Sequence, residues 1–295
     1  LRPEGRQGVM SRSLAAYGED YGRWAALWER QALLRARACA GDRELGGRFE
    51  ELINPLRWAE GGLSTQDLRE IRRIKARVET ERLPRGINPV RHLKLGPGGL
   101  SDVEWSAQVL QLAHAGQITG LRTTSTIAAL QAAVQGGLLS ADDGGVLVAA
   151  WILASRLRSA IVLGTGRASG PRSQVLPIQS REIRLVGRLI GLSAGREREL
   201  EDLYRRSARH ARAVAERIVF TDAAAHGPTA SAPSSTVSTA QPHSQESPSP
   251  RSAGSARSPR AQSRRGTGAA GSKSSRRANR NRATRRRPEG PYPWS

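Results

Sequence analysis

The sequence holds a single cysteine, Cys39, among 295 residues. One cysteine cannot form a disulfide within a chain, and it cannot supply the several thiolates of a cysteine-based zinc site. The composition therefore excludes a disulfide-rich secreted scaffold and a cysteine-ligated zinc module. A reducing compartment suits it, and we expect a cytoplasmic location.

Long apolar runs are also missing. The longest one extends over nine residues, 146–154, whereas a helix needs about 20 to span a bilayer. No signal-peptide pattern is visible in the first residues. We therefore expect no membrane among the partners of this chain.

Methionine occurs once, at Met10. The chain opens on Leu1-Arg2-Pro3, without an initiator methionine or a recognisable processed leader. We therefore expect Leu1 to lie inside a longer polypeptide. The alternative is a natural start at Met10, with the upstream residues added by an error in predicting the start.

Strand signals are absent too, because no run of alternating β-branched residues occurs. Apolar residues recur at helical spacing instead, and Asp42, Ser64 and Ser140 stand where they can cap helices. Residues 92–95 form a short extended segment, and the glycines that follow form a turn. The pattern predicts helices that cover residues 14–21, 24–39, 42–53, 64–78, 102–114, 124–134, 141–163, 180–190 and 195–220.

The last 74 residues, 222–295, have a different composition. Val237 is their only Ile, Leu, Val, Met or Phe, whereas they hold 15 serines, 9 prolines, 13 basic and 3 acidic residues. Such a segment cannot bury enough apolar area to offset the entropy of ordering it. The preceding 221 residues carry 34 basic and 23 acidic residues and are long enough for one or two domains.

The predicted disordered tail is rich in arginine towards its end, at positions 276, 277, 280, 282 and 285–287. Arginine-rich disordered runs bind polyanions through charge without reading sequence. We therefore expect weak, non-specific polyanion binding by the tail. The alternative is an accidental tail, from read-through or a shifted frame in GC-rich DNA.

The opening eight residues combine arginine and glycine, with Arg2 and Arg6 on either side of Glu4 and Gly5. Guanidinium groups bind phosphate oxygens in pairs, and glycine lets the backbone approach a ligand. This pattern indicates a phosphate contact. A plain turn has the same composition and stays open as the alternative.

A second candidate stretch joins Lys94, Gly98, Gly99, Asp102 and Glu104 around the start of a predicted helix. Glycines before a helix N-terminus can hold an anion. The two carboxylates could share a metal ion only in an extended chain, because on a helix they point about 200° apart. The alternative is that they cap the helix and favour its dipole. No Walker-type lysine follows the glycines, which excludes a P-loop.

Several motifs in one order and spacing resemble the bacterial glutamine synthetase adenylyltransferases. The resemblance extends from residue 1 to about residue 220. It is carried by residues 1–5, 12–17, 24–37, 40–42, 74–79, 92–95, 98–105 and 121–124.

This resemblance implies an enzyme with two nucleotidyltransferase domains, each followed by a helical domain. One half transfers AMP from ATP to a tyrosine of glutamine synthetase, and the other removes it with phosphate. The signal protein PII and glutamine bias the two activities. The chain resembles the C-terminal, transferase half, whose acidic residues hold Mg²⁺. The implied partners are glutamine synthetase and PII, and the implied cofactor and substrate are Mg²⁺ and ATP.

The resemblance also predicts that the catalytic carboxylates precede Leu1, so that no catalytic or metal-binding residue lies within this chain. Gly98 and Gly99 followed by Asp102 and Glu104 mimic the family's metal-binding signature, but at too short a spacing and in a helical context. The remaining candidates, expected near nucleotide or phosphate, are Arg2, Glu4, Arg6, Lys94, Gly98, Gly99, Asp102 and Glu104.

We therefore predict a mainly α chain of three parts. Residues 1–58 end an α/β nucleotidyltransferase domain, residues 59–221 form a helical bundle, and residues 222–295 form a disordered basic tail. The predicted function is that of a part of a glutamine synthetase adenylyltransferase, inactive by itself. The alternative is a non-catalytic helical adaptor that binds glutamine synthetase or PII, with a polyanion-binding tail.

Overall fold

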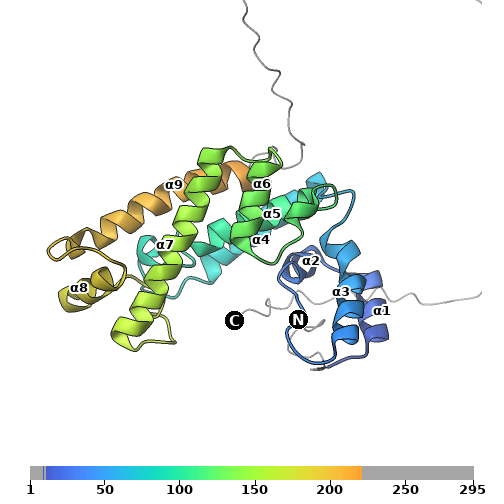
Figure 1. Cartoon of the computed structure of the whole chain (residues 1–295), viewed down its shortest axis with the longest axis horizontal. Helices are drawn as coiled ribbons and strands as arrows, with labels where there is room; N and C mark the ends of the chain where they lie inside the picture. The colour runs from blue at the N-terminus through green and yellow to red at the C-terminus, as the bar shows by residue number, and fades with distance from the viewer. Residues whose placement is uncertain (1–8, 10, 221–295) are drawn as a thin grey trace, which may run out of the picture. The chain divides into compact units, whose positions relative to one another are not determined.

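A computed structural model describes residue 9 and residues 11–220 of the chain (Figure 1). Within these residues every regular element is a helix, and the only β pairing is an isolated bridge between His92 and Val175. The mainly helical fold is thus confirmed. The predictions for residues 1–8 and for the tail fall outside the described residues, and the α/β character of the first part stays a prediction.

The helices follow one another along the chain with short connections. The α-helices are α1 (Leu14–Trp24), α2 (Leu27–Leu33), α3 (Arg43–Arg57), α4 (Thr65–Glu81), α5 (Leu100–His114), α6 (Thr126–Gln135), α7 (Ala141–Thr165), α8 (Ser180–Leu189) and α9 (Leu200–Phe220). Single turns of 3-10 helix lie between them, namely η2 (Pro89–Arg91), η3 (Thr119–Leu121) and η4 (Glu197–Glu199).

The three predicted capping residues are confirmed. The Asp42 carboxylate accepts the Leu45 amide at 2.7 Å, and the Ser140 hydroxyl accepts the Asp143 amide at 3.1 Å. At the start of α4, Ser64 and Asp67 form a reciprocal capping box. These contacts are local, because a side chain satisfies amides that the helix itself leaves free.

The predicted helix over residues 24–39 is wrong, because α1 extends to Trp24 and the separate helix α2 ends at Leu33. The backbone beyond α2 is held by other elements instead. Arg57 on α3 donates to the Ala36 carbonyl at 2.7 Å, and the Ala38 amide donates to Glu50 at 2.8 Å. Tertiary hydrogen bonds therefore replace the helical ones that the apolar spacing predicted.

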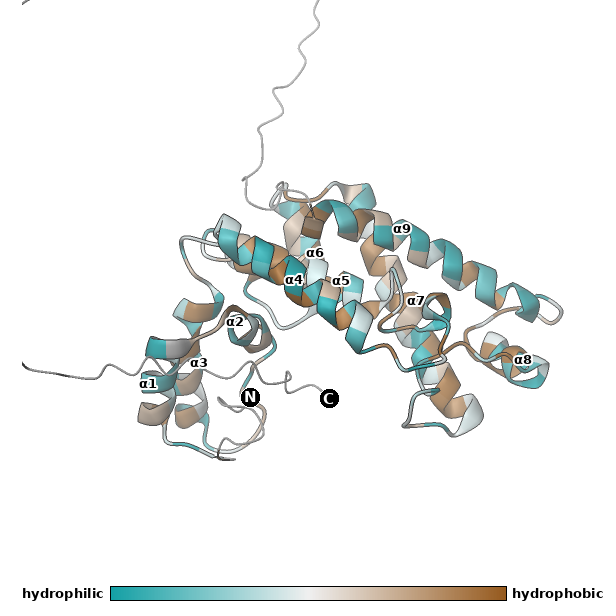
Figure 2. Ribbon diagram, turned by 180° about the vertical axis from the view of Figure 1, so that it is seen from behind, coloured by the Kyte–Doolittle hydropathy of each residue, from teal (hydrophilic) through white to brown (hydrophobic). Residues whose placement is uncertain are grey.

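Apolar side chains gather in three buried clusters within the described residues. One lies in α1–α3 and holds Tyr21, Leu33 and Ile53. A larger one joins α4, α5, α6, α7 and α9 around residues such as Leu110 and Leu147. The third fills the space between α8, the second half of α7 and the first half of α9. Figure 2 shows α7 with long apolar stretches and the outer side of α9 largely hydrophilic.

Helix α7 is long and apolar enough to cross a membrane by length and composition alone. In the fold, however, α7 packs against α5, α6, α8 and α9. Leu147, Leu157 and Ile161 along it are fully buried. Packing in the helical bundle therefore accounts for the apolar residues on its buried side.

The short helix α2 takes part in two of the clusters. Leu33 packs in the α1–α3 cluster, whereas Leu27 and the following Leu34 pack in the large cluster. A polar contact also joins α2 to the bundle, since Gln31 donates to Gln108 of α5 at 2.7 Å. Helix α2 therefore couples the first three helices to the bundle.

We expect Leu34→Ala to lower the free energy of unfolding by about 2–5 kcal/mol, because it opens a cavity at a fully buried site. The matched control is Leu45→Ala on α3, where the side chain is 53% exposed and the change should stay within about 0.5 kcal/mol. Urea unfolding followed by circular dichroism measures both. Equal effects of the two substitutions would contradict the coupling role of α2.

Candidate functional site

The glycine turn before α5 is held by its own backbone and by His92. The amides of Leu100 and Ser101 donate to the carbonyls of Leu93 and Lys94, each at 2.9 Å. The Nδ1 atom of His92 accepts the amides of Lys94 and Leu95, at 3.2 and 3.0 Å. The predicted turn is confirmed, and the helix that follows begins two residues earlier than predicted.

Gly98 in this turn meets the backbone of α9. Its φ is +72°, in the left-handed region that favours glycine. A Cβ atom built on Gly98 would lie 1.7 Å from the carbonyl oxygen of Ala208. No side chain fits there, so Gly98 lets the turn lie directly on α9.

Asp102 lies at the start of α5 with its side chain only 3% exposed. One carboxylate oxygen pairs with the ammonium group of Lys75 on α4. The other accepts the Gly98 amide at 2.7 Å and lies 3.1 Å from Arg212 on α9. Asp102 therefore joins three helices and the glycine turn at one point.

Glu79 completes this arrangement at the border with solvent. Its carboxylate lies 2.8 Å from Lys75 and 2.7 Å from Arg212. We call Lys75, Glu79, Asp102 and Arg212 the buried charge cluster. It has two cations and two carboxylates, so its members balance one another in a low-dielectric surrounding where an unpaired charge is costly.

The Arg212 guanidinium stays charged in this position. Burial disfavours the charged form, but hydrogen bonds to Glu79 and Glu216, together with the nearby Asp102, raise its pKa above the usual arginine value. Burial also raises the pKa of the neighbouring Tyr204 phenol, and the charge of Asp102 adds to this shift. Neither group therefore exchanges protons near neutral pH.

Asp102 and Glu104 do not converge as a metal site would require. Asp102 is turned inward onto Lys75, whereas Glu104 lies 3.9 Å from Arg35, after α2. In the described residues no group of three or more His, Cys, Asp or Glu side chains is placed to hold a metal ion. These carboxylates therefore do not fit Mg²⁺. Asp102 lies in the first turn of α5 and accepts the amide of Gly98, the residue before the N-cap Gly99.

The remaining candidates are dispersed. Lys94 is half-buried in the turn, and its nearness to nucleotide stays a prediction. Gly99 is buried beside the carbonyls of Leu93 and Gly96. Arg2, Glu4 and Arg6 lie outside the described residues.

His92 is buried in the middle of the turn. Burial lowers its pKa below the usual value, and the positive charges of Arg158 and Lys94 act in the same direction. Its carbonyl accepts the Tyr204 hydroxyl at 3.3 Å. His92 therefore acts as a neutral acceptor that shapes the turn.

Sequence reasoning did not single out Lys75 or Arg212 as site residues. A signal was present for both, because each falls at helical spacing on a buried stripe. Lys75 follows Leu68 by seven residues and Ile71 by four, and Arg212 follows Ala208 by four. A cation on an apolar stripe predicts a buried anionic partner, but the spacing does not say which one.

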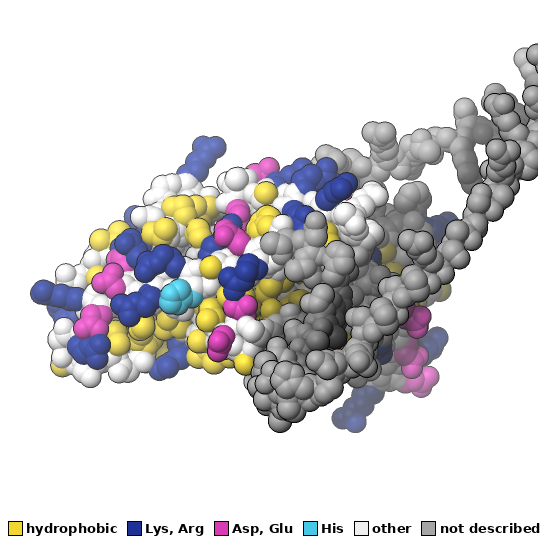
Figure 3. Space-filling model, turned by 90° about the horizontal axis from the view of Figure 1, so that it is seen from above, with side chains coloured by type: hydrophobic (Ala, Val, Ile, Leu, Met, Phe, Trp, Pro, Cys, Tyr) yellow, Lys and Arg dark blue, Asp and Glu magenta, His cyan; other side chains and the backbone are white. Residues whose placement is uncertain are grey.

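Beyond the buried charge cluster, one face of the described residues carries more basic than acidic side chains (Figure 3). The face shown in Figure 3 carries lysine and arginine side chains with fewer acidic ones between them. Such a surface favours acidic partners.

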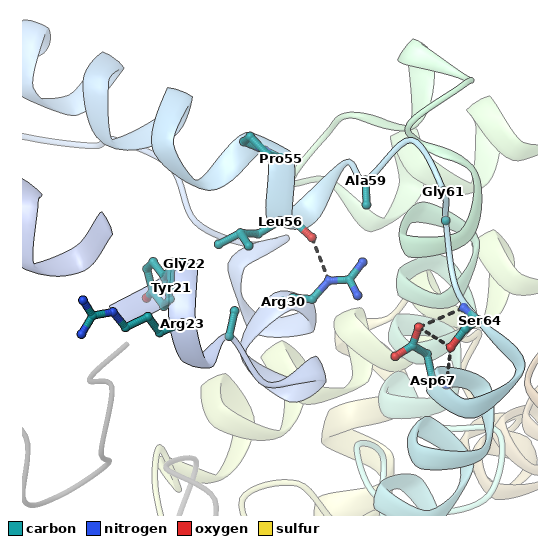
Figure 4. Close-up of a pocket in the computed structure, with 12 residues that line it drawn as sticks. Tyr21, Gly22, Arg23, Arg30, Pro55, Leu56, Ala59, Gly61, Ser64 and Asp67 are labelled. Atoms are coloured by element: carbon teal, nitrogen blue, oxygen red, sulfur yellow. Dashed lines mark hydrogen bonds between the residues drawn. The ribbon is translucent and has the colours of Figure 1, made fainter. Parts of the chain in front are cut away.

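One hollow lined by described residues has a volume of about 710 Å³. Figure 4 shows it between the end of α1, the end of α3 and the start of α4. Arg30 donates from its wall to the Leu56 carbonyl at 2.9 Å. Ser64 and Asp67 in the opposite wall hydrogen-bond to each other as the α4 cap. Its polar groups thus serve the fold, and we assign no chemistry to it.

Family models match the chain in two successive parts. Residues 69–218, about half of the chain, match the family described as GlnD PII-uridylyltransferase. Residues 1–52 match the family described as glutamate-ammonia ligase adenylyltransferase. The first range covers most of α4 and the rest of the bundle, and the second ends within α3.

Within the aligned region, curated relatives are about 50% identical to this chain. The bifunctional glutamine synthetase adenylyltransferase/adenylyl-removing enzyme of Streptomyces coelicolor is 53% identical over 220 residues, which are 75% of this chain and 22% of that protein. The enzyme of the same name from Streptomyces avermitilis is 51% identical over 216 residues, 73% of this chain and 21% of that protein. The enzyme of the same name from Cutibacterium acnes is 47% identical over 220 residues, which are 75% of this chain and 22% of that protein. The chain spans about a fifth of the length of these relatives.

We expect Lys75→Met to lower the free energy of unfolding by about 3 kcal/mol, because it leaves a buried carboxylate with one cation fewer. Arg77→Met on the same helix is the control, since Arg77 forms an exposed i,i+4 pair with Glu81 and should change stability by less than about 1 kcal/mol. Urea unfolding of both variants makes the comparison. If Lys75→Met is as mild as Arg77→Met, the buried charge cluster does not stabilise the bundle.

The lowered pKa of His92 predicts a loss of stability on acidification. Above a pH of about 6.5, the usual pKa of histidine in an unfolded chain, His92 is neutral in both the folded and the unfolded state. As the pH falls below that value the unfolded state binds a proton that the folded state does not, so the free energy of unfolding falls by up to about 1.4 kcal/mol per pH unit. Urea unfolding between pH 8 and 5.5 should show this slope, and His92→Asn should remove it while keeping an acceptor. An identical slope in the variant would assign the effect to other groups.

Proposed function

Because the chain belongs to the glutamine synthetase adenylyltransferase family, we propose that it is the C-terminal, helical portion of such an enzyme. In this proposal residues 1–58 end the nucleotidyltransferase domain, residues 59–221 form the helical domain, and residues 222–295 are a basic tail. The order of the two family matches, 1–52 and then 69–218, supports this division.

The proposed reaction of the whole enzyme is transfer of AMP from ATP to a tyrosine of glutamine synthetase, in the presence of Mg²⁺. Glutamine synthetase is the proposed substrate, PII the proposed regulatory partner, and the cytoplasm the proposed location. The name of the relatives supports glutamine synthetase as the substrate, because it describes an adenylyltransferase and adenylyl-removing enzyme of glutamine synthetase. Nothing in this proposal requires the chain to bind metal through Asp102 or Glu104.

The observation that supports an accessory role is the set of partners that the Asp102 carboxylate has inside the bundle. Asp102 is committed to Lys75, Arg212 and the Gly98 amide, so its charge is already neutralised inside the bundle. A carboxylate in that state braces helices and does not activate a substrate. In this proposal the helical portion therefore has an accessory role, and the residues that catalyse the transfer lie outside this chain.

An adaptor without any catalytic partner is the second candidate. The face that carries more basic than acidic side chains supports it, because such a face can bind an acidic partner protein without chemistry (Figure 3). The two candidates differ in one respect. The first requires the longer enzyme to which this chain contributes to transfer AMP, and the second does not.

We expect the purified chain to incorporate no label into glutamine synthetase from ATP labelled on the α-phosphate with Mg²⁺ present. The full-length protein from the same organism, assayed side by side, should label glutamine synthetase. Label above background with the chain alone would show that its own residues catalyse the transfer and would overturn the accessory role. Absence of label with the full-length protein, when its fold and glutamine synthetase are intact, would favour the adaptor.

A further inference from the structure

The connection between α3 and α4 contains two adjacent glycines, Gly61 and Gly62, a composition that is typical of a flexible hinge. It runs past Gly61 to the α4 cap at Ser64 (Figure 4). The two glycines have different surroundings. A Cβ atom built on Gly61 meets no described atom within 4 Å, whereas one on Gly62 would lie 2.3 Å from the Ala113 carbonyl oxygen of α5. The structure therefore requires glycine at position 62 and not at position 61.

Gly116, two residues after the end of α5, meets the same connection. A Cβ atom on Gly116 would lie 2.4 Å from the Ala59 carbonyl oxygen and 2.7 Å from the Cα atom of Glu60. The φ of Gly116 is not positive, so the local backbone conformation does not demand glycine. The close approach of the two backbones does. The two segments thus contact each other through backbone at two separate glycines.

Both of these segments are held in place by other contacts. Arg122 donates to the Ala115 carbonyl at 2.8 Å and to the Gly116 carbonyl at 2.9 Å. In the connection, Trp58 and Leu63 are each only 9% exposed and belong to the large apolar cluster. Neither segment can therefore move aside without breaking hydrogen bonds or exposing apolar side chains.

The region of α2 attaches the first three helices to the bundle independently. Gln31 donates to Gln108 of α5 at 2.7 Å. Arg35, after α2, donates to the hydroxyl of Thr126 at the start of α6 at 2.9 Å. None of these residues takes part in the glycine contact. A hinge motion about the glycine pair would have to break both attachments.

We propose that the connection between α3 and α4 is a rigid joint that fixes the orientation of α1–α3 on the bundle. Gly62 and Gly116 let the two backbones interlock, and a side chain at either position pushes them apart. A ligand or partner that moves the bundle then moves α1–α3 with it, because packed elements shift as rigid bodies. The joint lies where the sequence places a domain boundary, after residue 58. The inference concerns the chain itself and does not depend on the function proposed above.

The test measures the distance between two spin labels in the full chain by double electron–electron resonance. One label is attached to the native Cys39, which is exposed and follows α2. The other is attached through Arg209→Cys, at an exposed position of α9. A rigid joint predicts one narrow distance distribution. In urea, this distribution should broaden over the same concentrations at which circular dichroism loses its helical signal, because the joint opens only when the fold does.

Gly116→Ala tests the glycine contact directly. Its Cβ atom would have to move from 2.4 Å to about 3.3–3.6 Å from the Ala59 oxygen, the range of ordinary contacts between such atoms. The joint should therefore open, so that the label distances broaden or shift while the helical signal stays. The matched control is Gly61→Ala, which adds the same methyl group to the connection in open space and should keep the original distribution.

A narrow distribution in the original chain and in Gly61→Ala, with a broad or shifted one in Gly116→Ala, supports the proposal. A broad distribution in the original chain would reveal a hinge and overturn it. An unchanged distribution in folded Gly116→Ala would overturn it too, because the glycine contact would not fix the orientation. If Gly116→Ala loses its helical signal, the urea series on the original chain decides. Coincident transitions support the joint, and label distances that broaden before the helical signal falls overturn it.

Discussion

A buried carboxylate at the start of α5 constrains the rest of the bundle. Asp102 has lost its hydration, and it regains favourable interactions only where Lys75, Arg212 and the Gly98 amide all reach it. Removing one partner of such a group costs about 3–5 kcal/mol, a large part of the stability of a typical domain. Helices α4, α5 and α9 must therefore meet at this point, and the glycine turn must lie on top of it.

The turn and α9 then determine each other's position. Gly98 sits against the Ala208 backbone, where no Cβ fits, and His92 holds the turn through its Nδ1 atom. The third apolar cluster begins directly beside this contact, since it includes Leu93, Leu100 and Ala208. Val186 and Ile190 of α8 belong to the same cluster. The packing of α8 is thus continuous with the contacts around the glycine turn.

The arginines of this chain perform two different tasks. Arg57, Arg91 and Arg212 reach backbone carbonyls or carboxylates inside the fold, where their planar donors replace missing helical or loop hydrogen bonds. Arg181 and Arg184 on α8 are exposed. Composition counts both sets as one basic excess, although the first stabilises the fold and only the second is available to a partner. This distinction links the fold to the proposed accessory function.

The sequence by itself determined the local features of this protein. Asp42, Ser64 and Ser140 cap the predicted helices, because a cap depends on residues within one turn, and the family motifs are carried by consecutive residues. Only the tertiary structure decided the features that join distant residues. It ended α2 at Leu33 and turned Asp102 inward onto Lys75 and Arg212. Residues 102 and 212 stand 110 positions apart, and no periodicity in either helix says which buried cation will meet which carboxylate.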